Sequence, residues 1–246
     1  MPNIKLTLEY DGTRYHGWQR QSAEATIQGV LEENLKRITG ENITVIGAGR
    51  TDAGVHATGQ VANFKTRARL SPSAWQRALN SFLPEDIVVR KAEPVPERFH
   101  ARYSATGKIY QYHILNHPHR IAIRRQYQWV VFPTLNLARM RAALRILCGQ
   151  HDFSAFQAGP IMKPTRSSIC AIKRLSLSKT RDEILFTMEA DRFLHQMART
   201  IVGTVVEVGR GKHSPKELME ILQSKDRSRA GQTAPPQGLF LIAVQY

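Results

Sequence analysis

A glycine-rich loop carries the residues that could do chemistry in this chain. It runs from Ile46 to Phe64 and places glycines at positions 47, 49, 54 and 59 around one arginine, Arg50, and one carboxylate, Asp52. Glycine at this density marks backbone that turns sharply or lets another group approach closely. A charged pair on such a loop is a candidate functional site, but aspartate is also a common turn former. The loop alone leaves both interpretations open.

Two apolar segments flank this loop and are expected to position it. Residues 43–46 and 61–64 are rich in isoleucine, valine and phenylalanine, which predicts strands. The charged pair would then lie on a tight loop at a strand end, where functional residues are common.

Length and composition limit the class of protein. The chain has 246 residues, 42% of them hydrophobic, so it can bury a real core as one large domain or two small ones. No apolar run approaches the length of a membrane span, and the first residues lead directly into a strand pattern, which predicts no signal peptide. The two cysteines, Cys148 and Cys170, lack metal-ligand spacing. These features predict a cytoplasmic protein.

The net charge predicts a polyanionic partner. Lysine and arginine number 35 against 20 aspartates and glutamates, a balance of +15. The excess is uneven, since no acid occurs from Arg98 to His151. Tyrosines and a tryptophan alternate with the basic residues of this acid-free stretch, a composition typical of nucleic-acid contact, although a basic surface can also be only a solvated face. Its basic residues are Arg98, Arg102, Lys108, Arg120, Arg124, Arg125, Arg139, Arg141 and Arg145.

Periodicity and capping signals predict the other elements. Strands are expected over 4–10, 86–91, 105–116, 126–131, 169–178, 184–190 and 239–245. Helices are expected over 27–38 with Gly40 after the last turn, from Pro72 with Ser71 as N-cap, over 137–147, over 195–208, and from a Ser214–Glu217 capping box through Leu222.

The order of these elements predicts an α+β fold in two halves. Pro94, Pro96 and the turn to Arg98 suggest a boundary. We expect an N-terminal half over 1–104, which carries the Asp52 loop, and a C-terminal half over 105–246. Both halves mix strands and helices in a similar order, but no convincing sequence repeat is present.

Motifs for cofactors and metals are absent from the sequence. There is no phosphate-binding or dinucleotide-binding glycine loop, and no cysteine–histidine cluster has zinc spacing. The pairs His117–His119 and His151–Asp152 are interpreted as loop or capping features. We therefore expect chemistry without a cofactor or metal.

A second candidate for chemistry lies in a helix that is apolar nearly all round, over 193–208. Such a helix is usually buried, and it carries Arg199 near its middle. A buried guanidinium needs an anion, and Asp52 is the acid that would satisfy it. The alternatives are that Arg199 reaches solvent along its aliphatic stem or bonds a backbone carbonyl.

The motifs resemble those of one enzyme family. Residues 49–57, Gly-Arg-Thr-Asp-Ala-Gly-Val-His-Ala, are similar to the signature of the TruA-type tRNA pseudouridine synthases. The Lys108-x-Tyr110-x-Tyr112 segment and the segment from Asp191 to Arg199 resemble the second and third motifs. Segments 151–156 and 234–241 also resemble the family, so the likeness spans the chain in the family's order.

This resemblance implies roles for individual residues. Asp52 would be the catalytic nucleophile, Arg199 would pair with it, and Tyr110 would stack on the target base. Arg50, His56 and Lys108, which lie in the matching motifs, would bind substrate. Arg192 stands where the family has a glycine or another small residue, which affects local contacts only.

The same resemblance implies fold, reaction and partners. The fold would be two related α/β halves around a central antiparallel sheet with a basic catalytic cleft, and the enzyme would be a homodimer. It would isomerise uridine to pseudouridine at tRNA positions 38 to 40, after flipping the nucleotide out of the stem. Whether the aspartate attacks the base or the ribose, or assists loss of a ribose proton, is left open.

Two alternatives belong to other functional classes. One is a non-catalytic RNA-binding protein that uses the same basic cleft, and the other is a different RNA-modifying enzyme with a general-base aspartate. A bare RNA binder has no need for the charge of Asp52, which phosphates would repel.

Overall fold

The protein divides into two compact units in a computed structural model, which describes residues 1–132, 134–159 and 167–246. Unit 1 comprises Met1–Thr106 and Phe240–Tyr246, and unit 2 comprises Gly107–Leu239. The predicted division at 104/105 kept the last strand with the C-terminal half. In the structure this strand pairs with β3, so backbone hydrogen bonding places residues 240–246 in unit 1.

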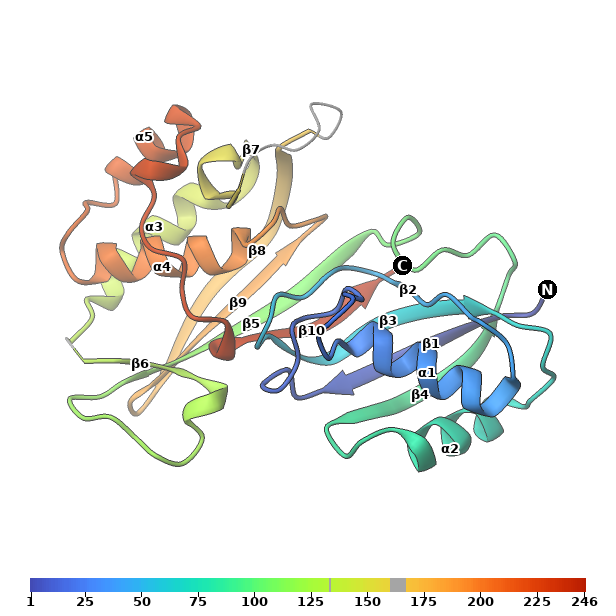
Figure 1. The fold of residues 1–246 in the computed structure, drawn as a ribbon. Coiled ribbons are helices and arrows are strands. Elements are labelled where there is room, and N and C mark those ends of the chain that lie inside the picture. Colours follow the sequence, from blue (N-terminus) through green and yellow to red (C-terminus); the bar gives the residue numbers. More distant parts are fainter. Residues whose placement is uncertain (133, 160–166) are drawn as a thin grey trace. The chain divides into compact units, whose positions relative to one another are not determined.

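Unit 1 is an antiparallel sheet with two helices (Figure 1). Its strands follow the order β4–β1–β3–β10, and the short β2 pairs with β3. Strand β10 pairs with β3 in parallel, with Phe240 opposite His56 and Leu241 opposite Ala57. Its elements are β1 (Asn3–Tyr10), α1 (Ile27–Thr39), β2 (Ile46–Gly47), β3 (His56–Lys65), α2 (Pro72–Phe82), β4 (Ile87–Val95) and β10 (Leu239–Gln245).

Unit 2 is a second α+β unit. Its strands follow the order β5–β9–β8–β7, and β6 pairs with β5 in parallel. Helix α3 packs against α4, α5 and β8. Its elements are β5 (Gly107–Asn116), β6 (Trp129–Val131), α3 (Leu137–Leu147), β7 (Gly149–Asp152), β8 (Ile169–Thr180), β9 (Glu183–Ala190), α4 (Met197–Gly209) and α5 (Glu217–Ser224). Helices packed on mainly antiparallel strands confirm the predicted α+β class.

Alternating burial builds the core of unit 1. Along β1, Ile4, Leu6 and Leu8 are buried while the residues between them are partly exposed, as one buried face requires. The same core contains Phe64 and Trp75, whose rings meet edge to face with centroids 5.3 Å apart. This packing fixes β3, and with it the end of the Asp52 loop.

Local signals in the sequence set several helix ends. Gly40 adopts a left-handed φ of 73° after α1, and the Ser71 side chain accepts the Ala74 amide at the start of α2, as predicted. Ser214 and Glu217 exchange the two hydrogen bonds of a capping box, although the regular helix α5 begins only at Glu217. Two further ends differ from the prediction: α4 starts at Met197 because Gln196 has a φ of 57°, and β6 starts at Trp129 after a 3-10 turn.

The predicted strand over 43–46 is wrong for most of its length. Only Ile46 belongs to a strand, in the two-residue β2. The backbone of Val45 bonds helix side chains instead of a neighbouring strand: its carbonyl accepts Gln28 Nε2 at 3.0 Å and its amide donates to Glu32 Oε1 at 3.0 Å. The approach to the Asp52 loop is therefore tied to α1.

Among the described residues, none of the helices combines the length and apolar character needed to cross a membrane.

Hydrogen bonding to Asp152 makes unit 2 sensitive to acid. Burial alone would raise the pKa of Asp152, but hydrogen bonds from Ser154, Ser168 and Lys225 hold that pKa well below its usual range. The Lys225 ammonium lies 2.9 Å from the carboxylate. A carboxyl with a lowered folded-state pKa stabilises the fold above the unfolded pKa of about 3.9, and this contribution is lost as pH falls toward the folded value.

We predict that Asp152→Asn lowers the free energy of unfolding by about 1 kcal/mol at pH 7, because bonds to a charged acceptor are weakened. The difference in free energy of unfolding between this variant and the unmutated protein should become smaller between pH 4 and pH 2. Urea unfolding across that range measures it. Lys225→Met, which removes one partner, should cost less. An equal loss for Asp152→Asn at all pH values would contradict a charge-dependent contribution.

Candidate functional site

The Asp52 loop is held through Thr51, the residue between its two charged side chains. Thr51 is buried; its carbonyl accepts the Trp18 amide at 3.0 Å, and its hydroxyl lies 2.9 Å from the Tyr10 hydroxyl. Arg50 is exposed and Asp52 is half-buried. The backbone is thus fixed between two side chains that solvent can reach.

Close backbone approach explains the glycines around this loop. Gly17 has a φ of 85°, and a Cβ there would lie 2.5 Å from the Thr51 carbonyl oxygen. A Cβ on Gly12 would lie 2.0 Å from the Val55 carbonyl oxygen. Gly54, in the loop itself, has a φ of 75°. Two of these glycines lie outside the signature, in the segment from Tyr10 to Trp18 that covers the loop.

Buried polar side chains support the loop from beneath. Gln60 Nε2 donates to the Gly49 carbonyl at 2.9 Å and lies 3.4 Å from the Tyr10 hydroxyl. Burial raises the pKa of Tyr10 to about 12, so its hydroxyl stays neutral at physiological pH. Neither residue was predicted as part of the site. The glutamine directly before the apolar pair Val61–Ala62 in β3 is the signal that could have identified one of them.

His56 lies at the start of β3 and is 1% exposed. Its Nδ1 lies 3.0 Å from the Gly12 amide and 3.1 Å from Asp11 Oδ1, and its ring stacks on Phe240 at 4.6 Å. The ring is therefore held by the Gly12 backbone, the Asp11 carboxylate and Phe240 together. These contacts support a role in holding the loop; its direct contact with RNA stays a prediction.

Unit 2 holds the other predicted site residues. Lys108 and Tyr110 are two residues apart on β5 and therefore lie on the same face of the strand. Tyr110 is buried, and its ring meets that of Phe193 edge to face, with centroids 4.9 Å apart. Tyr112, the next residue on this face, donates its hydroxyl to the Pro235 carbonyl at 2.7 Å. The Phe193 contact fixes the orientation of the Tyr110 ring.

Arg199 lies in α4, which is buried along nearly all of its length, as predicted. The side chain of Arg199 is half-buried, and its Nε donates to the Ala234 carbonyl at 2.8 Å. The Ala234 amide in turn donates to the Arg199 carbonyl at 3.1 Å. One alternative from the sequence, a bond to a carbonyl, is thus observed at Nε. The predicted ion pair joins residues of different units and stays a prediction.

The segment 231–235, which we call the strap, crosses α4 at close range. A Cβ on Gly203 would lie 1.8 Å from the Gln232 carbonyl oxygen, and the Gly231 amide donates to Thr204 Oγ1 at 3.0 Å. Arg227 bonds the strap at the Gly231 carbonyl, at 3.1 Å. The close approach of the strap explains why position 203 is glycine. The strap also carries the Ala234 carbonyl that orients Arg199.

The pairs His117–His119 and His151–Asp152, whose residue types could bind a metal, have structural roles. His151 Nε2 lies 2.9 Å from the Cys148 carbonyl, and Asp152 accepts the amide and hydroxyl of Ser154 at 3.0 and 2.5 Å. His117 Nδ1 accepts the His119 amide at 3.2 Å. In the part of the chain that the structure describes, no group of three or more histidine, cysteine or acidic side chains is placed to hold a metal.

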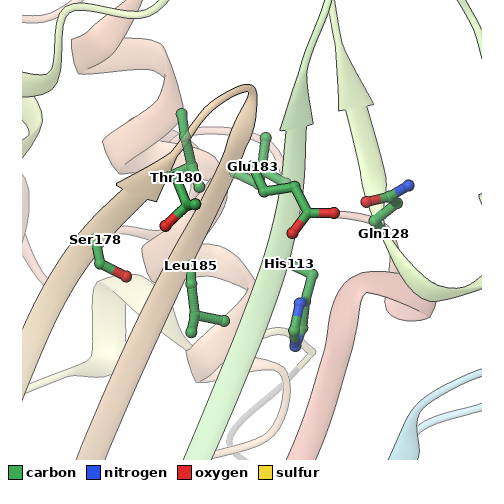
Figure 2. Close-up of a pocket in the computed structure, with 8 residues that line it drawn as sticks. His113, Gln128, Ser178, Thr180, Glu183 and Leu185 are labelled. Carbon is green, nitrogen blue, oxygen red and sulfur yellow. The ribbon is translucent and has the colours of Figure 1, made fainter.

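Figure 2 shows a small pocket near the β8–β9 turn in unit 2. Its volume of about 120 Å³ is below the roughly 300–1,000 Å³ that is usual for small-molecule sites. The pocket is lined by His113, Ile114, Gln128, Ser178, Thr180, Glu183, Ile184 and Leu185. None of the predicted site residues is among them, so we assign the pocket no part in the chemistry.

Comparison with known proteins agrees with the predicted motifs. The family described as tRNA pseudouridine synthase matches residues 7–104 and 143–246. The chain is similar to "tRNA pseudouridine synthase A" of Thermoanaerobacter sp. (strain X514), at 48% identity over 246 residues. It is also similar to the protein of that name from Ruminiclostridium cellulolyticum, at 44%, and to "tRNA pseudouridine synthase A 2" of Clostridium perfringens, at 45%. Each match covers 100% of both chains.

We predict that Gly17→Ala destabilises unit 1 by about 1–3 kcal/mol, because a left-handed backbone and a clash with the Thr51 carbonyl both oppose a side chain. Gly40→Ala is the matched control: Gly40 also has a positive φ, but nothing lies within 4 Å of an added Cβ. Urea unfolding of both variants should show the larger loss for Gly17→Ala. Equal losses would mean that the backbone contact carries no constraint.

Proposed function

Because this chain belongs to the tRNA pseudouridine synthase family, we propose that Asp52 is its nucleophile and that its target uridines lie at positions 38 to 40 of the anticodon stem and loop. The chain isomerises uridine to pseudouridine in tRNA. The bond from ribose C1′ to N1 of the base breaks, the base rotates, and a bond from C1′ to C5 forms. The hydrogen on C5 leaves as a proton, and N1 takes up a proton. No atoms are gained or lost in this reaction.

The observation that carries the assignment is how the loop presents Asp52. The residue before it is held by the Trp18 amide and the Tyr10 hydroxyl, and the loop turns at Gly54 directly after it. A carboxylate on such fixed backbone needs little reorganisation when substrate binds, and this fixed orientation favours attack on a bound substrate. A turn-forming aspartate would not require the buried side chains of Tyr10 and Gln60 to hold its loop.

The contacts and chemistry of the other predicted site residues suggest a role for each. Arg50 is exposed, and we assign it to the tRNA backbone or to the space that the flipped nucleotide leaves. Tyr110, oriented by Phe193, stacks on the target base, and Lys108 on the same strand face contacts a phosphate. Arg199 is the proposed ion-pair partner of Asp52. His56 supports the loop from Gly12.

The assembly and location of the enzyme are also proposed. We expect a homodimer in the cytoplasm, and Cys148 and Cys170 are both free thiols, as a reducing compartment allows. Family membership weighs against the non-catalytic RNA binder, because the named relatives are synthases.

We predict that Asp52→Asn abolishes pseudouridine formation in an unmodified tRNA transcript while leaving the Kd for that transcript within a few-fold. The change removes the nucleophile but little binding surface. Pseudouridine mapping with purified protein and no added cofactor measures the first effect, and filter binding measures the second. Asp182→Asn, in the exposed β8–β9 turn, is the matched control and should retain full activity. Substantial turnover by Asp52→Asn would place the chemistry on another residue.

We predict that Tyr110→Phe retains tRNA affinity, whereas Tyr110→Ala loses about 1–3 kcal/mol of stacking. Single-turnover rates separate a chemical role of the hydroxyl from stacking: a slow Tyr110→Phe variant with normal Kd assigns proton transfer to the hydroxyl. A Tyr110→Ala variant that binds and reacts like the unmutated protein would show that Tyr110 only packs against Phe193.

A further inference from the structure

An exposed tyrosine lies on the segment of unit 1 between β4 and the start of β5. Tyr103 is 73% exposed. Isolated exposed apolar side chains are ordinary on protein surfaces. Tyr103 differs in two respects: its ring belongs to a group of basic and aromatic side chains, and the backbone beneath it is held by buried polar residues.

The group of side chains around Tyr103 has the composition of a nucleic-acid contact. The His100 ring lies 4.3 Å from the Tyr103 ring, and the Arg102 guanidinium lies 5.9 Å from the Tyr103 ring centroid. Arg98, on the same segment, is exposed. We call these four residues the Tyr103 cluster. A flat ring beside guanidinium groups can take both a base and its phosphate.

Two buried asparagines hold the backbone of this segment. Asn63 Oδ1 accepts the Ala101 amide at 2.8 Å, and Asn63 Nδ2 donates to Asn3 Oδ1 at 2.9 Å. Asn3 Nδ2 donates to the carbonyls of Pro96 and Phe99 at 3.1 and 2.9 Å. Both asparagines are less than 4% exposed. Breaking these bonds would leave buried amides unsatisfied, which is costly.

The C-terminal residues hold the same segment from its other side. The Tyr246 hydroxyl donates to the Ala101 carbonyl at 2.8 Å, and the Tyr246 ring lies 5.0 Å from that of Phe99. The Thr106 amide donates to the Gln245 carbonyl at 2.9 Å. Tyr103 therefore projects from fixed backbone, and a ligand that stacks on it loses little conformational entropy.

The charge around the cluster favours an anion. No acid follows Arg98 until Asp152. The acid that precedes it, Glu97, lies 3.3 Å from the Lys65 ammonium and 3.4 Å from the N-terminal amine, and hydrogen bonding from these groups lowers its pKa. Glu97 is thus matched by two cations of its own.

We propose that the Tyr103 cluster is an RNA-contact site separate from the residues assigned to chemistry, on which an unpaired base of the tRNA stacks against Tyr103. Arg98 and Arg102 hold the adjoining phosphates. Stacking on a tyrosine ring is tolerant of base identity, because every base has a π-face, so the site adds affinity without reading sequence. This inference rests on tRNA as the substrate but not on the assignment of the nucleophile.

The test measures equilibrium binding of the full-length protein to a fluorescently labelled, unmodified tRNA transcript. It is made in an Asp52→Asn background, whose turnover is measured first, and is repeated with Asp52 intact. Tyr103→Ala should raise the Kd about 5- to 150-fold, the loss expected for one stacked base. Tyr103→Phe and Tyr103→Trp, which keep a π-face, should stay within about twofold. The matched control is Phe82→Ala, which removes another exposed ring of unit 1, 52% exposed, and should leave the Kd unchanged.

Salt dependence tests the arginines. Arg102→Ala should reduce the slope of log K against log salt by about 0.7, as loss of one single-strand phosphate contact does. An unchanged slope would remove Arg102 from the site.

Several outcomes would overturn the proposal. One is a Kd for Tyr103→Ala within twofold of the Asp52→Asn parent. Another is a change in oligomeric state by light scattering without a change in Kd, which would assign the cluster to contact between two copies of the chain. A third, measured with Asp52 intact, is a slower single turnover at saturating enzyme with unchanged Kd, which would assign Tyr103 to chemistry.

Two further measurements keep the test decisive. Thermal unfolding establishes that each variant is folded, and Tyr103→Gln, which keeps side-chain bulk without a π-face, replaces Tyr103→Ala if the latter unfolds. Pseudouridine formation by the unmutated protein is measured separately, so failure of the Tyr103 proposal and failure of the Asp52 assignment give different results.

Discussion

The Asp52 loop depends on the hydrogen bonds of Thr51. The backbone carbonyl of Thr51 accepts the Trp18 amide, and its side-chain hydroxyl bonds the Tyr10 hydroxyl. Both partners belong to the N-terminal 18 residues, so strand β1 and the turn after it position a loop that follows about 30 residues later. A glycine at position 17 is the consequence, because any Cβ there would meet the Thr51 carbonyl.

Unit 2 also holds a predicted site residue through close contact between distant segments, in this case on a helix. The strap carbonyl at Ala234 fixes Arg199, and the glycine at position 203 lets the strap approach α4. The next residue of the strap, Pro235, accepts the Tyr112 hydroxyl through its carbonyl. Burial raises the pKa of Tyr112, so the hydroxyl keeps its proton at physiological pH and continues to donate. In both units a side chain assigned to function is attached to backbone that a sequence-distant segment holds in place.

Local chemistry made much of the fold predictable from the sequence. Gly40 and Ser71 mark helix ends by conformations and hydrogen bonds that depend on neighbouring residues only, and both predictions were confirmed. The strand predicted over 43–46 was wrong because side chains of α1 compete for the Val45 backbone, a tertiary contact that periodicity does not encode.

The candidate site likewise combines features that neighbouring residues determine with features that only tertiary contacts determine. The signature around Asp52 could be identified from consecutive residues, whereas Tyr10, Gln60 and the strap act through contacts between distant segments. A buried glutamine or a helix glycine signals that such a contact exists, but its partner appears only in the folded chain.

The distribution of charge also depends on which acidic side chains form ion pairs within the fold. Many acids of unit 1 are engaged by its own cations: Asp86 binds Arg14 at 2.6 Å, and Glu32 binds Arg20 at 2.8 Å. Glu93 lies between Lys5 and Lys91, and hydrogen bonds from these lysines lower its pKa. Because the acid-free stretch 98–151 supplies arginines without acids of its own, the net charge of +15 falls disproportionately on that stretch. A protein that pairs many of its acids internally and leaves an exposed tyrosine beside an arginine has a surface suited to a flexible polyanion with exposed bases.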